Sequence, residues 1–171
     1  MLRIETDRLL LTHLNADDAE HILELLNEES FIRNIGDRGV RNLDDARCYI
    51  ENGPMASYRQ HGFGLNRVAL RDCGPPIGIC GLLQRDYLEH PDIGFAFLPR
   101  YWSQGYALEA ADAVLAHALQ TFQIARVLAT TALDNLSSVR VLGKLGFRFD
   151  RLIKAPGYDE ESRLFVRDFS D

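Results

Sequence analysis

Cysteine is scarce in this sequence, and its three cysteines follow no recognisable spacing. Their number is odd, and none of Cys48, Cys73 and Cys80 belongs to a C-x-x-C pair. This pattern argues against a disulfide-stapled secreted domain and against a zinc site. Cys80 lies in the apolar run 77–83, where a reduced thiol in the core is the simplest interpretation.

Long apolar stretches are also missing. No segment reaches the roughly 18 consecutive apolar residues that a membrane-spanning helix needs. Residues 1–7 lack the apolar core of a signal peptide. We therefore expect a cytoplasmic protein without a membrane partner.

Positive charge is in short supply. The 171 residues include 19 Lys and Arg against 25 Asp and Glu, which gives a formal net charge of -6 at pH 7. Binding to nucleic acid without sequence preference needs the opposite balance, so that function is disfavoured. An acidic chain instead favours a cationic partner, such as an amine or a basic protein.

Two common phosphate-binding motifs are absent from the sequence. It contains no G-x-x-x-x-G-K-[ST] segment and no G-x-G-x-x-G segment at the end of a strand. A nucleoside triphosphatase and a dinucleotide dehydrogenase are accordingly disfavoured.

The composition that remains is that of an ordinary globular domain. The chain has 46% hydrophobic and 26% charged residues. It shows no internal repeat, linker or low-complexity stretch. A chain of this length can form one hydrophobic core but is short for two. We therefore predict that residues 1–171 form a single domain.

Hydrophobic periodicity predicts strands first and alternating strands and helices afterwards. The predicted strands cover residues 7–14, 64–70, 77–84, 90–98, 126–131, 147–153 and 163–168, and the predicted helices begin near residues 15, 42, 107 and 135. Gly and Pro at 72–76 suit a hairpin connection. A loop, with or without a helical turn, is expected at 31–40. Gly53-Pro54 is expected to interrupt the helix that Asn42 caps.

The stretch 93–110 combines three local signals and is the first candidate site. An apolar run ends at Pro99, and from Ala107 the apolar residues recur with a helical period of about 3.6. Gly105 and Ala107, which have the smallest side chains, lie in the turn between strand and helix. The N–H groups of the first helical turn would then be free to bind a phosphate. A simple turn is the alternative interpretation.

The second candidate site is the predicted helix 135–145. Asn135 suits its N-cap and Gly146 its C-cap. The apolar positions predict one buried stripe, formed by Leu136, Val139, Leu142 and Leu145. These roles leave Ser138 without an assignment. Its hydroxyl is either a local partner of the helix cap or a functional group.

The two candidate sites and the elements around them resemble the GNAT superfamily of acyl-coenzyme A-dependent N-acetyltransferases. The resemblance spans nearly the whole chain and is closest to the branch that acetylates N-terminal amines of ribosomal proteins. The segments that carry it are Thr6-Asp7-Arg8-Leu9-Leu10-Leu11, Asp92-Ile93-Gly94-Phe95, Tyr101-Trp102, Gly105-Tyr106-Ala107, Asn135-Leu136-Ser137-Ser138 and Lys144-Leu145-Gly146-Phe147. It implies an α/β (α+β) fold with a mixed, mostly antiparallel central sheet flanked by helices.

The resemblance also implies where acetyl-coenzyme A (acetyl-CoA) lies as a co-substrate. The pantetheine arm is expected to pair with the strand backbone at Phe95, Ala96 and Phe97. The pyrophosphate is expected on the turn formed by Trp102, Ser103, Gln104, Gly105, Tyr106 and Ala107. Trp102 departs from the Gln or Arg that the family usually has, and Ser103 stands where this branch often has glycine. Asn135 is expected to bond either pantetheine or the helix that it begins.

Catalysis in the family is direct attack of a neutral amine on the thioester, without a metal or a covalent enzyme intermediate. The tyrosine acid of many members is replaced here by Leu142, which leaves Ser138 as the expected acid for the departing thiolate. Asp92 stands where the branch usually has glutamate, and is either the base, acting through a water, or structural. Glu109 is expected to favour the helix dipole or to bond backbone.

The acceptor is expected to be a peptide or protein α-amine. An α-amine with a pKa of about 7.7 to 8.0 needs a weaker base than a lysine amine with a pKa near 10.4. An acidic cleft would favour basic sequences. The alternatives are a small amine, such as a polyamine or an aminoglycoside, and an acyl-CoA sensor without turnover. The sequence is compatible with a monomer or a homodimer.

Overall fold

The computed structural model describes residues 1–169, which form one eight-stranded sheet in the order β1-β2-β3-β4-β5-β6-β8-β7. The strands are β1 Arg3–Glu5, β2 Leu9–His13, β3 Leu65–Leu70, β4 Pro76–Leu83, β5 Asp92–Phe97, β6 Arg126–Ala132, β7 Arg148–Ile153 and β8 Ser162–Asp168. The helices are η1 Ala16–Asp18, α1 Ala19–Leu26, α2 Glu29–Asn34, α3 Leu43–Ile50, η2 Glu51–Met55, α4 Ala56–His61, η3 Pro99–Tyr101, α5 Tyr106–Phe122 and α6 Leu136–Lys144. Every neighbouring pair of strands is antiparallel except β5 and β6. The predicted mixed, mostly antiparallel sheet is confirmed.

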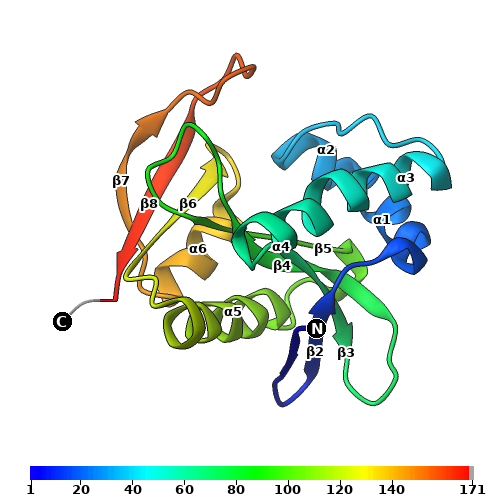
Figure 1. The fold of residues 1–171 in the computed structure, drawn as a ribbon. Helices are drawn as coiled ribbons and strands as arrows, with labels where there is room; N and C mark the ends of the chain where they lie inside the picture. The colour runs from blue at the N-terminus through cyan, green and yellow to red at the C-terminus, as the bar shows by residue number, and fades with distance from the viewer. Residues whose placement is uncertain (170–171) are drawn as a thin grey trace.

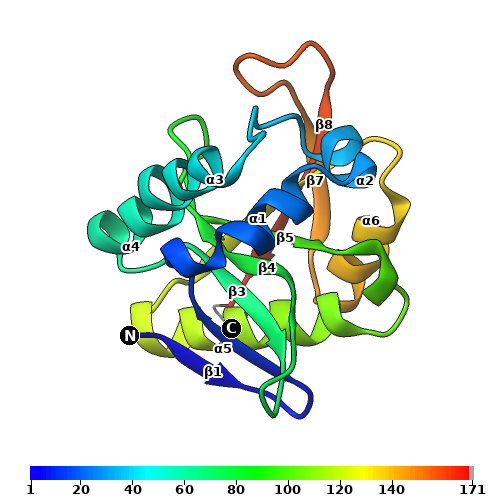
Figure 2. The same cartoon turned by 90° about the vertical axis from the view of Figure 1, so that its right-hand side faces the viewer.

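Helices cover both faces of the sheet (Figures 1 and 2). On one face, α5 packs against β2, β4 and β5, with α6 beside it. On the other face, α1 packs against β4 and α3. Leu11 and Val68, paired across β2 and β3, belong to the core under α5, whereas Ile79 of β4 belongs to the core under α1 and α3. The alternation of side chains along the strands therefore builds a hydrophobic core on each face, and a smaller third cluster contains Leu88, Leu128, Leu164 and Val166.

The N-caps expected from the sequence are present. Asn15 forms a capping box with Asp18 at the start of η1. At the start of α3, the Asn42 side chain accepts from the Asp45 N–H at 2.8 Å. These oxygens satisfy backbone donors that have no acceptor within the helix.

The predicted interruption at Gly53-Pro54 is present, because the α-helix ends at Ile50, but the chain stays helical through the interruption. α3 runs directly into η2, a π-helical turn that contains Pro54, and η2 runs into α4. In an α-helix a proline lacks the N–H donor and its ring clashes with the preceding turn. The wider π turn accommodates the ring, and Pro54 is buried there.

The strand β1 lies outside the sequence prediction, because its three residues are too few for a periodic signal. α2 supplies the helical turn that the prediction left open in the range 31–40. None of the helices in residues 1–169 is both long and apolar enough to cross a membrane.

β5 and β6 are paired over a short length. Their register contains one pair, Asp92 with Leu128, and the Leu128 N–H donates to the Pro91 carbonyl at 2.9 Å. Beyond this point β5 stays paired with β4, and β6 stays paired with β8. The sheet therefore opens between β5 and β6.

The close contact between β4 and β5 gives a test of the fold at Gly78. A Cβ atom there would lie 2.4 Å from the Ala96 carbonyl oxygen and 2.7 Å from Cδ1 of Phe97. Since neither group can move without disturbing the strand pairing, we expect Gly78→Ala to lower the free energy of unfolding by about 1–3 kcal/mol, as measured by urea denaturation.

The matched control for this measurement is Gly143→Ala in α6, where no atom lies within 4 Å of the new Cβ. Alanine favours an exposed helix over glycine, so this variant should gain up to about 1 kcal/mol. A Gly78→Ala protein as stable as wild type would contradict the β4–β5 packing.

Candidate active site

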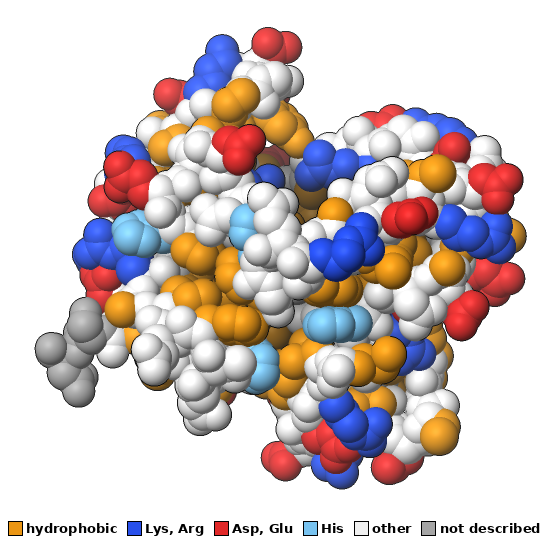
Figure 3. Space-filling view, viewed as in Figure 1, with side chains coloured by type: hydrophobic (Ala, Val, Ile, Leu, Met, Phe, Trp, Pro, Cys, Tyr) orange, Lys and Arg blue, Asp and Glu red, His pale blue; other side chains and the backbone are white. Residues whose placement is uncertain are grey.

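A cleft of about 940 Å³ occupies the opening between β5 and β6. Residues of α2 and α3 line one side, residues of β6, α6 and the β7–β8 loop line the other, and the turn before α5 closes one end. In the space-filling view the molecule is hollowed between two lobes, with Lys and Arg side chains at the rim (Figure 3). Every site residue predicted from the sequence lines this cleft except Gln104, which lies beside it.

β5 presents part of its backbone to the cleft. In an antiparallel ladder, alternate residues direct their N–H and C=O groups toward the same neighbour. The Leu98 N–H donates to the Ile77 carbonyl of β4 at 2.9 Å. Two residues earlier, Ala96 therefore also faces β4, whereas Phe95 and Phe97 direct their backbone groups toward the opening. Three positions were predicted to pair with the coenzyme through their backbone. The backbone groups of Phe95 and Phe97 face the cleft, whereas those of Ala96 are directed toward β4, although the residue itself lines the cleft.

Trp102 covers the end of β5. Its indole Nε1–H donates to the Phe97 carbonyl oxygen at 2.8 Å, and 44% of the residue is exposed. A carbonyl that faces away from the ladder would otherwise need another partner. The tryptophan thus completes the strand end while its ring lines the cleft.

The turn before α5 exposes a row of backbone N–H groups. Ser103 and Gly105 have left-handed backbone, with φ of 60° and 82°, and such a turn forms a concave nest for an anion. The first helical bond runs from the Glu109 N–H to the Gly105 carbonyl at 3.1 Å, so the N–H groups of 106–108 have no helical acceptor. No side chain of the described residues caps this helix start. The geometry is that of a phosphate cradle.

Arg8 holds this turn in place, a role that the sequence did not predict. Its guanidinium donates through Nη1 to the Gln104 carbonyl at 2.8 Å and through Nε to Glu109 at 2.7 Å. It also lies 4.5 Å from the centroid of the Tyr106 ring. A Cβ atom on Gly105 would lie 3.2 Å from its Nη2. These contacts place the positive charge of Arg8 beside the cradle.

Glu109 anchors the chain between β1 and β2 to the first turn of α5. Its carboxylate accepts from Thr6 Oγ1 at 2.6 Å and from the Arg8 N–H at 2.9 Å, in addition to Arg8 Nε. Burial alone would raise the pKa of Glu109, but the hydrogen bonds from Thr6 and Arg8 lower it. The prediction that Glu109 bonds backbone is confirmed. Thr6 and Arg8 belong to the segment 6–11, which contributed to the family resemblance. Nothing in that segment indicated that these two residues contact α5.

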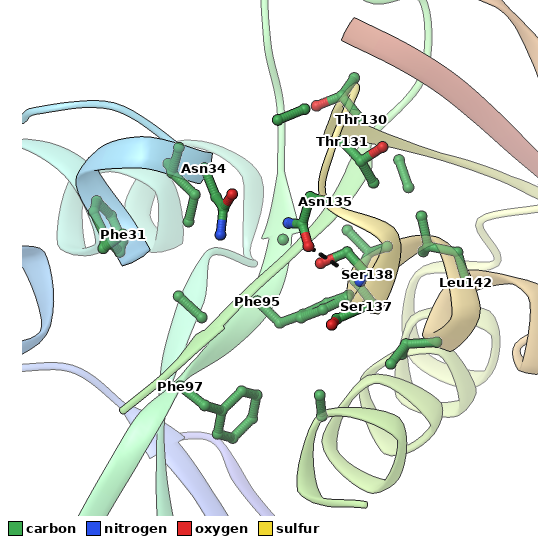
Figure 4. Close-up of a pocket in the computed structure, with 18 of the residues that line it drawn as sticks. Phe31, Asn34, Phe95, Phe97, Thr130, Thr131, Asn135, Ser137, Ser138 and Leu142 are labelled. Carbon is green, nitrogen blue, oxygen red and sulfur yellow. Dashed lines mark hydrogen bonds between the residues drawn. The ribbon is translucent and has the colours of Figure 1, made fainter. Parts of the chain in front are cut away.

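α6 brings Asn135 and Ser138 to the wall opposite β5 (Figure 4). The Asn135 Oδ1 accepts from the Ser138 N–H at 3.3 Å, so the cap uses the backbone of the serine and leaves its hydroxyl available. The Asn135 amide nitrogen points toward β5, and the Phe95 side chain extends toward Ser138. Leu142, one turn further along the helix, is buried.

The predicted buried stripe of α6 is wrong at its first residue. Leu136 is 53% exposed and lines the cleft, whereas Leu142 and Leu145 are buried. Leu136 is the first residue of α6 and lies at the edge of the cleft, where no other element of residues 1–169 covers it. An apolar side chain at the rim of a cleft is suited to contact an apolar part of a ligand.

Asp92, the first residue of β5, is buried and forms an ion pair with the half-buried Arg85. Arg85 Nε donates to both carboxylate oxygens of Asp92, at 3.0 and 3.1 Å, and Asp92 is only 1% exposed. Burial raises the pKa of Asp92 to about 6, and the charge of Arg85 limits the rise. A carboxyl group with this pKa can exchange a proton near neutral pH. Arg85 was missed because it lies in the loop after β4, where no periodicity fixes its direction.

The charged residues that line the cleft are mostly basic. They are Arg33, Arg38, Arg85, Arg140 and Lys144, against Asp92 and Asp134. The expectation of an acidic cleft is therefore wrong, although the chain as a whole has a net charge of -6. Net charge is a sum over the surface and does not determine the local field in a cleft.

Comparison with known proteins identifies the family. A family model described as an acetyltransferase (GNAT) domain matches residues 8–148. The chain belongs to this family. It is an acyltransferase that depends on acetyl-CoA.

Similar proteins agree on the activity class and the fold. YoaA and YnaD of Bacillus subtilis (strain 168), both described as uncharacterized N-acetyltransferases, are 26% and 29% identical over 153 and 154 residues, covering 88% and 90% of this chain and 85% and 86% of theirs. A GNAT-family acetyltransferase structure from Bacillus anthracis aligns at 24% identity with a TM-score of 0.81, over 98% of this chain and 99% of that one. The RimL ribosomal L7/L12 alpha-N-protein acetyltransferase, in complex with coenzyme A, aligns at 14% identity with a TM-score of 0.85, over 98% of each chain.

Removing the partner of Asp92 tests the ion pair. The folded-state pKa of about 6 lies above the ordinary value of 3.8, so folding favours the protonated group. This group's contribution to stability therefore falls as the pH rises from about 4 to about 6 and is constant above that. Arg85→Gln removes the charge that limits the pKa of Asp92 in the folded protein. In this variant the contribution of Asp92 to stability should therefore keep falling to a higher pH than in wild type.

Urea denaturation of wild type and Arg85→Gln at pH 5 and pH 8 measures this effect. We expect the stability deficit of the variant to be larger at pH 8, by on the order of 1 kcal/mol or more. Arg47→Gln is the control, because Arg47 is a half-exposed arginine paired with an exposed carboxylate. A deficit of Arg85→Gln that is equal at both pH values would show that the two side chains are not electrostatically coupled.

Proposed function

We propose that this GNAT acetyltransferase transfers the acetyl group of acetyl-CoA to the α-amine of a peptide or protein N-terminus. The observation that carries the proposal is the Asp92 carboxyl group, which lines the cleft and has a pKa raised to about 6 by burial. A carboxylate of this basicity can receive the proton of an attacking amine. Because Asp92 is buried against Arg85, the proton reaches it through a water.

A base of this strength suits an α-amine better than a lysine. Moving a proton from an α-ammonium of pKa about 7.7 to 8.0 to a carboxylate of pKa about 6 costs about 2 to 3 kcal/mol. The same transfer from a lysine with a pKa near 10.4 costs about 6 kcal/mol. The difference favours the N-terminal amine.

The co-substrate would lie along the open edge of β5. Phe95 and Phe97 offer the backbone groups with which the amides of pantetheine can pair. The turn 103–107 and the start of α5 offer N–H groups to the pyrophosphate. Asn135 offers its amide nitrogen from the opposite wall. That a structure with this fold holds coenzyme A supports the assignment.

The amine nitrogen attacks the thioester carbon, the C–S bond breaks, and coenzyme A departs as a thiolate. A β5 backbone N–H that faces the opening polarises the carbonyl as negative charge develops on its oxygen. The Ser138 hydroxyl, which the helix cap does not use, donates a hydrogen bond to the thiolate and relays to it, through water, the proton that leaves the amine, so that the hydroxyl is restored. No bond forms between the acetyl group and the enzyme.

The alternative acceptors and the sensor role have less support. A polyamine or an aminoglycoside carries several positive charges, which the mostly basic lining of the cleft would repel. A sensor without turnover would need an obstructed acceptor side. The cleft instead extends from the turn before α5 to residues of α2 and the β7–β8 loop.

The experiment that tests the proposal compares two peptides at pH 7 with saturating acetyl-CoA. One has a free N-terminus and no lysine, and the other has the same length, a blocked N-terminus and one lysine. The neutral fractions of the two amines differ by more than about 100-fold, so the free N-terminal peptide should release coenzyme A at least about tenfold faster. Faster acetylation of the blocked peptide would refute the α-amine assignment.

Ser138→Ala tests the proposed acid. We expect kcat to fall by about 10²-fold with little change in the Kd of acetyl-CoA, because the hydroxyl acts on the leaving thiolate. Ser137→Ala is the matched control, since Ser137 is exposed, lies on the same turn of α6 and lines the same cleft. If the two variants have the same kcat, Ser138 serves only the helix cap.

A further inference from the structure

The end of the cleft away from the α5 turn gathers two guanidinium groups and a phenol. β5 runs five residues back from Phe97 to Asp92, a distance of about 16 Å. At Asp92 it meets Arg85, which follows β4. Arg38, from the loop between α2 and α3, and Tyr49, from α3, line the same cleft. This site, Arg38, Arg85 and Tyr49, is separate from the phosphate cradle.

Tyr49 lies within electrostatic reach of both arginines. Burial raises the pKa of the Tyr49 phenol, and the positive charges of Arg38 and Arg85 act against that rise. The phenol therefore keeps its proton at neutral pH. It adds an O–H donor beside two cationic N–H donors.

Arg38 is held over the cleft by the β7–β8 loop. Its Nη1 donates to the Tyr158 hydroxyl oxygen at 3.2 Å, and that hydroxyl lies 3.5 Å from the Ile35 carbonyl that accepts from it. A Cβ atom on Gly36 would lie 3.4 Å from the same hydroxyl. The contacts of Tyr158 thus fix the loop that carries Arg38.

The positive charge of the site is not neutralised by the described part of the chain. Asp37, the neighbour of Arg38, is bound by Arg41 at 2.5 Å. Asp92 is bound by Arg85 through Nε, and the neutral Tyr87 phenol, which also lines the cleft, lies beside the same guanidinium. Among the ion pairs within residues 1–169, none involves Arg38. Arg85 therefore has one carboxylate partner, and Arg38 has none within residues 1–169.

We propose that Arg38, Arg85 and Tyr49 bind an anionic group, a carboxylate or a phosphate, that the acceptor carries close to the amine that is acetylated. All three side chains are hydrogen-bond donors, and a guanidinium matches the two oxygens of a carboxylate or phosphate. Because Arg85 also contacts Asp92, the bound anion lies beside the group that takes the proton of the amine. In a peptide acceptor, this chemistry selects an acidic side chain within about the first three residues.

The inference rests on the proposed function and reverses the charge preference that the sequence suggested. An acidic cleft would have selected basic N-termini. The mostly basic lining instead selects acidic N-termini, and Arg33 of α2 adds a further positive charge to the same cleft.

The test uses three peptides that differ only at positions 2 and 3, which are Asp-Asp, Asn-Asn or Lys-Lys, each with a free N-terminal alanine. Thiol release with saturating acetyl-CoA gives kcat/KM for each peptide. A charged hydrogen bond predicts a preference of about tenfold or more for the Asp peptide over the Asn peptide, and a still lower value for the Lys peptide. In a parallel arm, free O-phosphoserine is compared with free serine.

Arg38→Gln should reduce the ratio of the Asp peptide to the Asn peptide to about twofold or less, mainly through a higher KM for the Asp peptide. Circular dichroism checks that this variant is folded. Arg47→Gln is the matched control, because Arg47 lies on α3 with Tyr49, pairs with Asp44 and does not line the cleft. It should keep the wild-type ratio.

The outcomes separate this inference from the function on which it rests. Equal kcat/KM for the Asp and Asn peptides, or a preference for the Lys peptide, overturns the anion site and leaves the α-amine function standing. Acetylation of O-phosphoserine in preference to serine, with no peptide acetylated, supports the anion site and overturns the peptide function. An unchanged preference in Arg38→Gln overturns the assignment of the site to these residues.

Discussion

The separation of β5 from β6 is the constraint on which the rest of this structure depends. A strand whose neighbour departs after one pair has a row of backbone donors and acceptors without a ladder, and such groups must be satisfied. Here Trp102 satisfies one of them at Phe97, and the remainder face a cleft deep enough for an extended ligand. The open edge is therefore both a cost to the fold and the feature that a pantetheine chain can complete.

The opening persists because a single core spans it from below. Residues of α5 pack against β4 and β5, and the same cluster includes Val127 and Ala129 of β6 and Phe165 of β8. Small side chains at Ala110 and Ala111 let the helix lie close to the sheet. The two halves of the sheet are thus fixed to one helix, and the N-terminus of that helix is the phosphate cradle. Fold stability and the position of the cradle depend on the same contacts.

Much of the fold was predictable because it is encoded in local patterns. The long apolar period of α5, the Asn caps at Asn42 and Asn135, and the hairpin at 72–76 are signals within a few residues, and the structure has each of them. The cradle was predictable for the same reason, since a glycine before a helix is a local feature. Leu136 is exposed although it lies on the apolar stripe, because periodicity gives the face of a helix but not where the opposing layer ends.

The missed residues act across long stretches of sequence. Arg8 contacts a carbonyl 96 residues away, and Arg38 contacts a hydroxyl 120 residues away. Arg85 is only seven residues from Asp92, but the loop between them has no periodicity from which to infer that they meet. The basic lining of the cleft was hidden for a related reason, because an acidic chain can still concentrate basic side chains on the helices and loops that border one opening.

The contact between Tyr158 and Arg38 has a dynamic consequence. It joins two exposed loops from opposite lobes by one hydrogen bond, reinforced by the weaker approach of Tyr158 to Ile35. An exposed hydrogen bond of this kind contributes on the order of 1 kcal/mol, so this contact holds the two loops together only weakly. Local motion can therefore separate the two loops without any rearrangement of the sheet.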